Sequence, residues 1–213
     1  MQIAQKIRNK IRAFLQAYGT RKVKMHLWDT EFSQGRWDCL DATIGDCVYS
    51  YIQKAANGGS ILDLGCGSGS TANELGANTY RDYTGVDISD VAIDKARTRT
   101  DENGRADKIR FFQSDVFSYV PSQQFDVILF RDSLYYIARP IIRPVLERYS
   151  KYLKKGGVFI VRMDGGAKRH RIAHIIESNF YILEKRMHKQ PDAVVLVFRP
   201  RPDPRTTLRQ IAN

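Results

Sequence analysis

The sequence predicts an α/β protein built on a mostly parallel sheet with helices on both faces. From residue 60 to residue 200, short runs rich in β-branched residues alternate with longer helical patterns, as expected of stacked β-α-β units. A glycine-rich turn, Gly65 to Gly69, directly follows the first of these runs. The last two runs are separated by Gln190-Pro191-Asp192, a turn-forming cluster that predicts a hairpin and one antiparallel strand.

The individual elements follow from this alternation. We expect strands at Ser60–Leu64, Tyr83–Asp87, Ile109–Ser114, Phe125–Phe130, Gly157–Met163, Phe180–His188 and Ala193–Arg199. We expect helices at Ser70–Gly76, Asp90–Thr100, Pro140–Leu153 and Lys168–Asn179.

Three parts of the chain differ in character. Residues 1–57 begin with a helical pattern, end in the chain-breaking Asn57-Gly58-Gly59, and are interpreted as an N-terminal helical cap. Residues 58–200 form the predicted α/β domain. Residues 201–213 belong to a basic C-terminal tail that is expected to be extended and disordered.

Composition limits the class of protein. With 213 residues, of which 43% are hydrophobic, the chain can bury one core but is short for two independent domains. It contains no run of the roughly 18 apolar residues that a membrane-spanning helix requires, and no apolar signal core at its N-terminus. The three cysteines lack the spacing of a zinc site or a disulfide framework, so we expect a soluble, cytoplasmic protein without a metal.

Positive charge is concentrated at the two ends. The chain has 34 basic and 23 acidic side chains, a net charge of +11, which favours an anionic partner. Residues 1–18 form a basic amphipathic pattern whose apolar members are Ile3, Ile7, Ile11, Phe14, Leu15 and Tyr18. This helix either packs on the domain or on a second subunit, or makes peripheral contact with an anionic membrane surface.

The glycine turn predicts a nucleotide site, because glycines let the backbone approach a ligand and the following helix offers N–H donors. Its spacing also fits a dinucleotide site, through Gly67, Gly69 and Ala72. Asp63, two residues before the first glycine, would repel a pyrophosphate but attract the ammonium group of a methionine moiety. The turn therefore favours S-adenosylmethionine over a dinucleotide.

Two later strands end in acidic residues. Asp87, about 20 residues beyond the turn and followed by Ile88, is placed to accept both ribose hydroxyl protons. Helix capping is the alternative for Asp87, but Ser89 lies closer to the expected helix start. Asp115 is placed to accept from the amine of an adenine while Val116 contacts the ring, although an aspartate after a strand is also an ordinary turn residue.

The order of these segments resembles that of the class I S-adenosylmethionine-dependent methyltransferases over about residues 58 to 200. The segments that carry the resemblance are Leu62–Gly69, Gly85–Ser89, Ser114–Val116, Phe125–Leu129 and Leu153–Gly157. The resemblance implies a Rossmann-like, seven-stranded sheet with an antiparallel last strand. It also implies that Gly65, Gly67 and Gly69 face the methionine and ribose, with Asp87 on the ribose hydroxyls and Asp115 and Val116 at the adenine.

The cap and the loops beyond the strands supply further candidates. Arg36 and Trp37 look like the cap element of several small-molecule methyltransferases, where such side chains help close the cofactor pocket; packing of the cap is the alternative for Trp37. Arg131 begins the loop after the fourth strand and is also expected at the cofactor.

The acceptor's proton must be removed when methyl transfer goes to a hydroxyl or an ammonium. Many relatives carry a histidine near the position of Tyr136, so this sequence lacks the simplest base. Tyr136 is one catalytic candidate, although it would need activation to act as a base. Asp132, Asp164 and the cap residue His26 are the others, each with a purely structural alternative.

The sequence as a whole predicts a methyltransferase that uses S-adenosylmethionine, releases S-adenosylhomocysteine, and modifies an oxygen or nitrogen of a small molecule. A natural product, a sugar or a lipid-linked acceptor fits, and the basic excess is compatible with an anionic one. A nucleic-acid methyltransferase, acting on RNA rather than DNA, and a non-catalytic cofactor-binding relative are the alternatives. We expect a monomer or a homodimer.

Overall fold

A computed structural model of the chain describes residues 2–40 and 45–202 and contains a seven-stranded sheet in the order β3-β2-β1-β4-β5-β7-β6. The strands are β1 (Ser60–Leu64), β2 (Asp82–Asp87), β3 (Ile109–Gln113), β4 (Phe125–Arg131), β5 (Leu153–Asp164), β6 (Tyr181–Lys189) and β7 (Asp192–Arg199). Strands β1 to β5 pair in parallel, whereas β7 runs antiparallel to both β5 and β6. The predicted mostly parallel sheet with an antiparallel last strand is confirmed.

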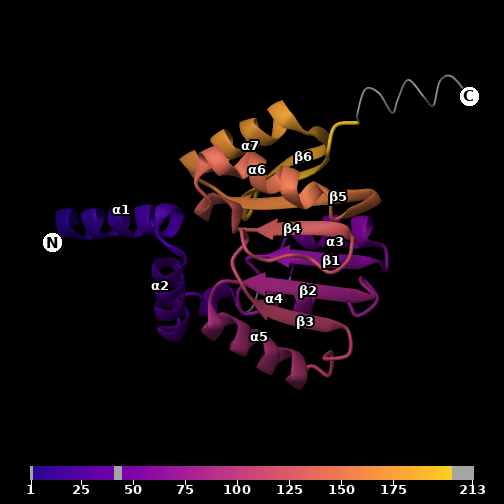
Figure 1. Ribbon diagram of the computed structural model, residues 1–213, viewed down its shortest axis with the longest axis horizontal. Coiled ribbons are helices and arrows are strands. Elements are labelled where there is room, and N and C mark those ends of the chain that lie inside the picture. Colours follow the sequence, from indigo (N-terminus) through magenta and orange to yellow (C-terminus); the bar gives the residue numbers. More distant parts are fainter. Residues whose placement is uncertain (1, 41–44, 203–213) are drawn as a thin grey trace, which may run out of the picture.

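Helices cover both faces of this sheet, as Figure 1 shows. They are α1 (Gln2–Tyr18), α2 (Arg21–Ser33), α3 (Val48–Ala56), α4 (Ser70–Glu74), α5 (Asp90–Glu102), α6 (Arg139–Ser150) and α7 (Ala167–Asn179), with short 3-10 turns η1 (Asp38–Leu40) and η2 (Leu134–Tyr136).

The strand period of two divides the core into two layers. Ile61 belongs to the layer packed on α3, α4 and α5, whereas its neighbour Leu62 belongs to the layer packed on α6 and α7. All five residues of β1 are buried, as expected of a central parallel strand covered on both faces.

The main difference from the predicted elements lies between α6 and β5. The helix ends at Ser150 rather than at the expected Leu153, and the strand begins at Leu153 rather than at Gly157. Leu153 pairs with Phe125 of β4, and the register shifts before Val127 pairs with Val158. Leu153 is therefore part of the strand and not of the helix, because it pairs with a strand that is distant in the sequence. Local propensity does not report such pairing.

The N-terminal helices lie beyond the carboxyl ends of the strands. In Figure 1 the arrowheads of β2 and β4 point toward α1 and α2, which stand at that side of the domain. The expected disorder of the basic tail falls mostly on residues outside the described part of the chain. No helix among the described residues combines the length and the apolar character needed to cross a bilayer.

Candidate active site

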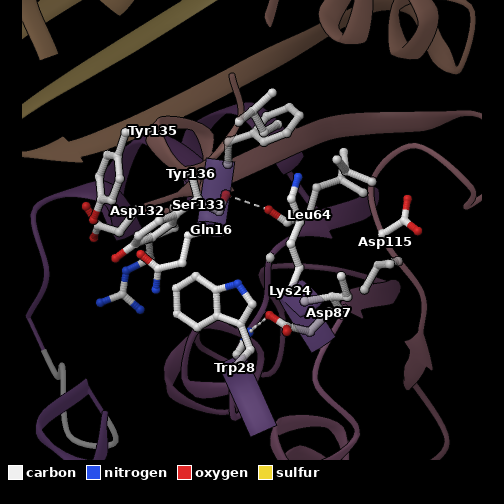
Figure 2. Close-up of a pocket in the computed structure, with 18 of the residues that line it drawn as sticks. Gln16, Lys24, Trp28, Leu64, Asp87, Asp115, Asp132, Ser133, Tyr135 and Tyr136 are labelled. Atoms are coloured by element: carbon white, nitrogen blue, oxygen red, sulfur yellow. Dashed lines mark hydrogen bonds between the residues drawn. The ribbon is translucent and has the colours of Figure 1, made fainter. Parts of the chain in front are cut away.

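A cavity of about 210 Å³ lies at the carboxyl edge of the sheet, beneath α1 and α2. The carboxyl edge is where open α/β sheets bind their ligands. Figure 2 shows side chains from the N-terminal helices and from the loops after several strands converging on it. Its lining includes Gln16, Lys24, Trp28, Trp37, Gly65, Gly67, Asp87, Ile88, Asp115, Val116, Arg131, Asp132, Tyr135 and Tyr136.

The glycine turn forms one wall of the cavity. Gly65 has φ +85°, and a Cβ there would lie 2.4 Å from Cβ of Ser133, so both its conformation and its surroundings exclude a side chain. Gly65 and Gly67 line the cavity. Gly69 does not; a Cβ there would meet Phe111 at 2.8 Å and Ala96 at 2.9 Å, which shows that this glycine lets the turn pack against β3 and α5.

Asp63 lies behind the turn and is only 1% exposed. Its Oδ2 accepts a hydrogen bond of 2.5 Å from the hydroxyl of Tyr83, whereas its Oδ1 is buried and has no hydrogen-bond partner among the described residues. Burial raises the pKa of Asp63 to about 7. Asp63 also borders a small cavity of about 70 Å³ together with Gly65 and Gly67. An unpaired carboxylate oxygen at that point fits an ammonium group, the group that the methionine part of S-adenosylmethionine would present.

Asp87 ends β2 and faces the larger cavity, as Figure 2 shows. Its two carboxylate oxygens accept from the backbone N–H groups of Gly67 and Ser89, each at 2.9 Å. The expected capping role of Ser89 is confirmed, because Oγ of Ser89 accepts from the N–H of Ala92 at 3.1 Å. A carboxylate has about four lone-pair sites, so Asp87 keeps acceptor capacity that a hydroxyl of a ribose could use.

Asp115 also lines the cavity, but its carboxylate has several partners in the protein. Oδ1 accepts from the backbone N–H groups of Phe117 at 2.7 Å and Ser118 at 2.9 Å. Oδ2 accepts from the hydroxyl of Ser118 at 2.9 Å and lies 3.2 Å from Nε of Arg21. Asp115 thus acts as a turn residue, which was the alternative role for it. Its contact with adenine stays a prediction.

Ile88 and Val116 complete this side of the cavity. The carbonyl of Ile88 accepts from the side chain of Gln113 at 2.9 Å. The carbonyl of Val116 accepts from Arg148 at 2.8 Å and from the hydroxyl of Tyr149 at 2.9 Å, which fixes the loop after β3 on α6. Both residues line the cavity, and the predicted contacts of Ile88 with the cofactor and of Val116 with the adenine stay predictions.

Two arginines with buried side chains pair with aspartates under the opposite wall and form an ionic cluster. Arg131 lies 2.8 Å from Asp46, and Arg162 pairs with Asp132 and, at 2.6 Å, with Asp164. Burial raises the pKa of Asp46, but Arg131, the backbone N–H of Val48 and Arg162 together outweigh it and hold that pKa below its ordinary value. Arg131 reaches the cavity wall with its charge already balanced, so its predicted role at the cofactor stays a prediction.

Asp132 and Tyr136 lie together on another part of the cavity wall, as Figure 2 shows. Asp132 has φ +52°, a left-handed conformation that is uncommon outside glycine, and its carboxylate accepts from Arg162 and from the N–H of Asp164. Burial raises the pKa of Asp132 despite Arg162. Burial also raises the pKa of Tyr136 to about 12, and the Tyr136 ring meets Trp28 edge-on at 4.7 Å between centroids.

The other catalytic candidate, His26, is not brought to this group. It is an exposed residue of α2 and does not line the cavity, while its carbonyl accepts from the hydroxyl of Thr30 at 2.8 Å. The structure therefore gathers Asp132 and Tyr136 and leaves His26 apart.

Of the two cap candidates, Trp37 lines the cavity and Arg36 does not. Trp37 Nε1 donates to Glu31 at 3.0 Å, and its ring lies 5.8 Å from that of Trp28. Arg36 is exposed and borders a separate, neighbouring groove with Arg169. Both the packing role and the pocket role considered for Trp37 are thus present in one side chain.

Sequence reasoning missed Gln16 and Lys24, which reach the cavity from α1 and α2. Burial lowers the pKa of Lys24, while Asp115 opposes that change. Figure 2 shows the Lys24 side chain among Leu64, Asp87 and Asp115. The apolar periodicity of α1 pointed to the other side of that helix, so no local signal would have identified Gln16.

Comparison with known proteins agrees with this geometry. Residues 61–157 match the model of a family described as a methyltransferase domain. Magnesium-protoporphyrin O-methyltransferase of Rhodobacter capsulatus is 30% identical over 158 residues, which cover 73% of this chain and 69% of that protein. 27-O-demethylrifamycin SV methyltransferase of Amycolatopsis mediterranei is 26% identical over 62% of this chain.

Among solved structures, the N-methyltransferase NodS from Bradyrhizobium japonicum in complex with S-adenosyl-L-homocysteine has the same fold. Its TM-score is 0.66 at 17% identity, and the match covers 84% of this chain and 98% of that one.

The chain spans half or less of the length of the first curated relatives it matches, 27% of a sterol 24-C-methyltransferase of Gibberella zeae and 50% of the Amycolatopsis protein. The relative from Rhodobacter, by contrast, is matched over most of both lengths. The similarity to the Rhodobacter protein and the seven-stranded topology point to the same kind of protein as the geometry of the site. The chain belongs to the class I S-adenosylmethionine-dependent methyltransferases.

Proposed function

We propose that this chain transfers a methyl group from S-adenosylmethionine to an oxygen or nitrogen of a small-molecule acceptor. One observation carries the proposal: a single cavity joins the glycine turn and Asp87 to the side chains of Trp28, Asp132 and Tyr136. A cofactor held at the first group would present its reactive end to an acceptor held at the second.

The residues on the cofactor side suit the parts of that molecule. The unpaired oxygen of Asp63 holds the ammonium group, Asp87 holds the ribose hydroxyls, and Asp115 with Val116 borders the adenine. When bound, S-adenosylmethionine supplies a methyl group on a positively charged sulfur. Lys24 extends into this side of the cavity, so its side chain has to turn aside for a nucleoside to fit.

Aromatic side chains form the acceptor side. Trp28, Trp37, Tyr135 and Tyr136 line the cavity, and their rings exclude water and favour an acceptor with an apolar body next to the reacting atom. A natural product or a lipid-linked molecule meets that requirement, and so does a sugar that carries an apolar group. The names of two relatives, magnesium-protoporphyrin O-methyltransferase and 27-O-demethylrifamycin SV methyltransferase, support a small-molecule acceptor.

In the proposed mechanism, Asp132 is the base that accepts the acceptor's proton, and Tyr136 orients the acceptor. Tyr136, with its pKa raised to about 12, stays protonated at neutral pH and donates a hydrogen bond that orients the acceptor. Asp132 is held in place by Arg162 and accepts the proton from the acceptor's hydroxyl or ammonium group. Burial raises the pKa of Asp132, so the rate should rise with pH through a value above that of an ordinary aspartate.

A labelled-methyl assay tests the proposal. The chain is incubated with S-adenosylmethionine labelled in its methyl group and with separate small-molecule, lipid and RNA extracts. We expect label in the small-molecule or the lipid extract. Label in RNA alone would overturn the choice of acceptor, and binding of S-adenosylmethionine without any transfer would identify a non-catalytic relative.

Substitution of Asp132 sharpens this assay. Asp132→Asn should lower the rate roughly 100-fold or more, the usual contribution of a general base, and leave cofactor affinity unchanged. Asp164→Asn is the matched comparison, because Asp164 also pairs with Arg162 and lines the cavity, but its side chain is exposed at the rim. Equal losses in the two variants would show that the ionic cluster, and not the proton acceptor, is what matters.

A further inference from the structure

Helix α1 is attached to the domain by its polar side. Arg12 pairs with Glu31 of α2, and Nε2 of the buried Gln16 donates to the same carboxylate at 3.3 Å. Gln16 also lines the active-site cavity. The side of α1 that faces the protein is therefore the side that an amphipathic helix normally turns to water.

The apolar side of α1 faces outward. Ile7, Ile11, Phe14 and Tyr18 are spaced by four, three and four residues along one stripe and are 52%, 54%, 61% and 57% exposed. The rings of Phe14 and Tyr18 stack with 5.1 Å between their centroids. Figure 1 shows α1 standing off from the sheet domain, and none of the helices and strands that the structure describes lies over its outer side. A continuous exposed apolar stripe of this kind marks an interaction surface.

Cationic side chains border this stripe. Lys6, Arg8 and Lys10 are exposed on either side of it. At its C-terminal end, Tyr18 also borders a groove over α6 and α7 whose other lining residues are mainly basic: Arg139, Pro140, Arg143, His170, Arg171, His174, Ile175 and Asn179. The apolar stripe thus leads directly into a concave basic surface.

We propose that this surface docks the protein on an anionic lipid bilayer. The apolar stripe enters the boundary between head groups and acyl chains, Tyr18 lies at the level of the head groups, and the groove over α6 and α7 receives lipid phosphates. A second copy of the chain is a poorer occupant, because pairing two such stripes would bring the lysines and arginines of both copies together. Anionic head groups neutralise the same charges.

Docking in this orientation has a consequence for the active site. Gln16 lines the cavity from the side of α1 opposite Phe14 and Ile11, so the bilayer would lie one helix diameter from the cavity. Resting on the proposed function, this favours an acceptor that resides in or on the membrane. The docking itself does not depend on catalysis.

Sedimentation with vesicles tests the docking without any cofactor. The full chain is mixed with vesicles of phosphatidylcholine alone or with added phosphatidylglycerol, at low and at high salt. We expect binding to the phosphatidylglycerol vesicles that weakens as salt is raised. Ile11→Glu combined with Phe14→Glu should lower that binding at least tenfold, and Lys10→Glu should lower it severalfold.

Controls separate the possible outcomes. Val120→Glu changes an equally exposed apolar residue on the loop after β3, and it should leave vesicle binding unchanged. Circular dichroism and binding of S-adenosylmethionine establish that each variant is folded. The proposal is overturned if the wild-type chain stays unbound with both kinds of vesicle, or if it sediments as a dimer that Ile11→Glu dissociates.

Discussion

The carboxyl edge of the sheet and the α1–α2 cap enclose the same cavity in different ways. At the edge, backbone groups hold the functional carboxylate, since Asp87 accepts from the N–H groups of Gly67 and Ser89. At the cap, the contacts are between side chains: the carboxylate of Glu31 pairs with Arg12 and accepts hydrogen bonds from Gln16 and Trp37. The sheet edge of the cavity is therefore preorganised by the fold, whereas the cap depends on a few polar contacts that can open.

The comparison predicts that the edge controls cofactor binding. Asp87→Ala should weaken the affinity for S-adenosylmethionine roughly 100-fold, because it removes two hydrogen bonds to a charged group and leaves the N–H of Gly67 without its acceptor. Isothermal titration measures this. Asp82→Ala, at the opposite end of β2, is the control and should bind like the wild type; an Asp87→Ala variant of full affinity would refute the ribose role.

The protonation of Asp63 should make both the stability of the chain and its cofactor affinity depend on pH. Its pKa of about 7 in the folded chain lies above the ordinary 3.8, so between about pH 4 and pH 7 the native state binds more protons than the unfolded chain. The free energy of unfolding that Asp63 contributes therefore falls as pH rises through this window. Cofactor affinity should rise across it, because the ammonium group requires the ionised carboxylate.

Asp63→Asn separates these two effects. The variant should gain thermal stability relative to the wild type at pH 8 but not at pH 4, and should bind S-adenosylmethionine at least tenfold more weakly at pH 7. Calorimetry and titration check the two parts. Unchanged affinity together with raised stability would mean that Asp63 is only a strained core residue.

A substitution in the cap should have a smaller effect, on stability. Glu31→Gln leaves Arg12 without its counter-ion and weakens three contacts at once, so the free energy of unfolding should fall by about 1–3 kcal/mol. Denaturant unfolding measures it. Glu147→Gln, which breaks the exposed pair with Arg143, should cost only about 0.5 kcal/mol, and equal effects would show that Glu31 does not anchor the cap.

The two regions also differ in how far the sequence predicts them. The positions of Asp63, Gly65 and Asp87 at the ends of their strands are predictable from the sequence, because strand, turn and helix follow one another along the chain and local patterns report such arrangements. The fold and its antiparallel strand were predicted for the same reason. Gly69 was expected at the ligand but packs on α5, since spacing alone does not show which way a glycine's missing side chain would point.

The cap was predicted less well. For the apolar stripe of Ile7, Ile11 and Phe14, the sequence leaves two alternatives: packing on the domain or a second subunit, or contact with a membrane surface. In the structure the stripe is exposed, and the opposite side of α1 packs on the domain. The outcome was decided by Glu31, a single buried carboxylate in the next helix. Contacts between separate helices carry no local periodicity, so Gln16 and Lys24 could not be assigned to the cavity in advance.

A structure of the chain in complex with S-adenosylhomocysteine would show whether the glycine turn, Asp63 and Asp87 hold the cofactor. We predict that the ribose hydroxyls donate to Asp87, that the amino group lies within hydrogen-bond distance of Oδ1 of Asp63, and that the sulfur faces Asp132 and Tyr136. A nucleoside bound away from the glycine turn, or an Asp63 carboxylate with no contact to the ligand, would contradict the account.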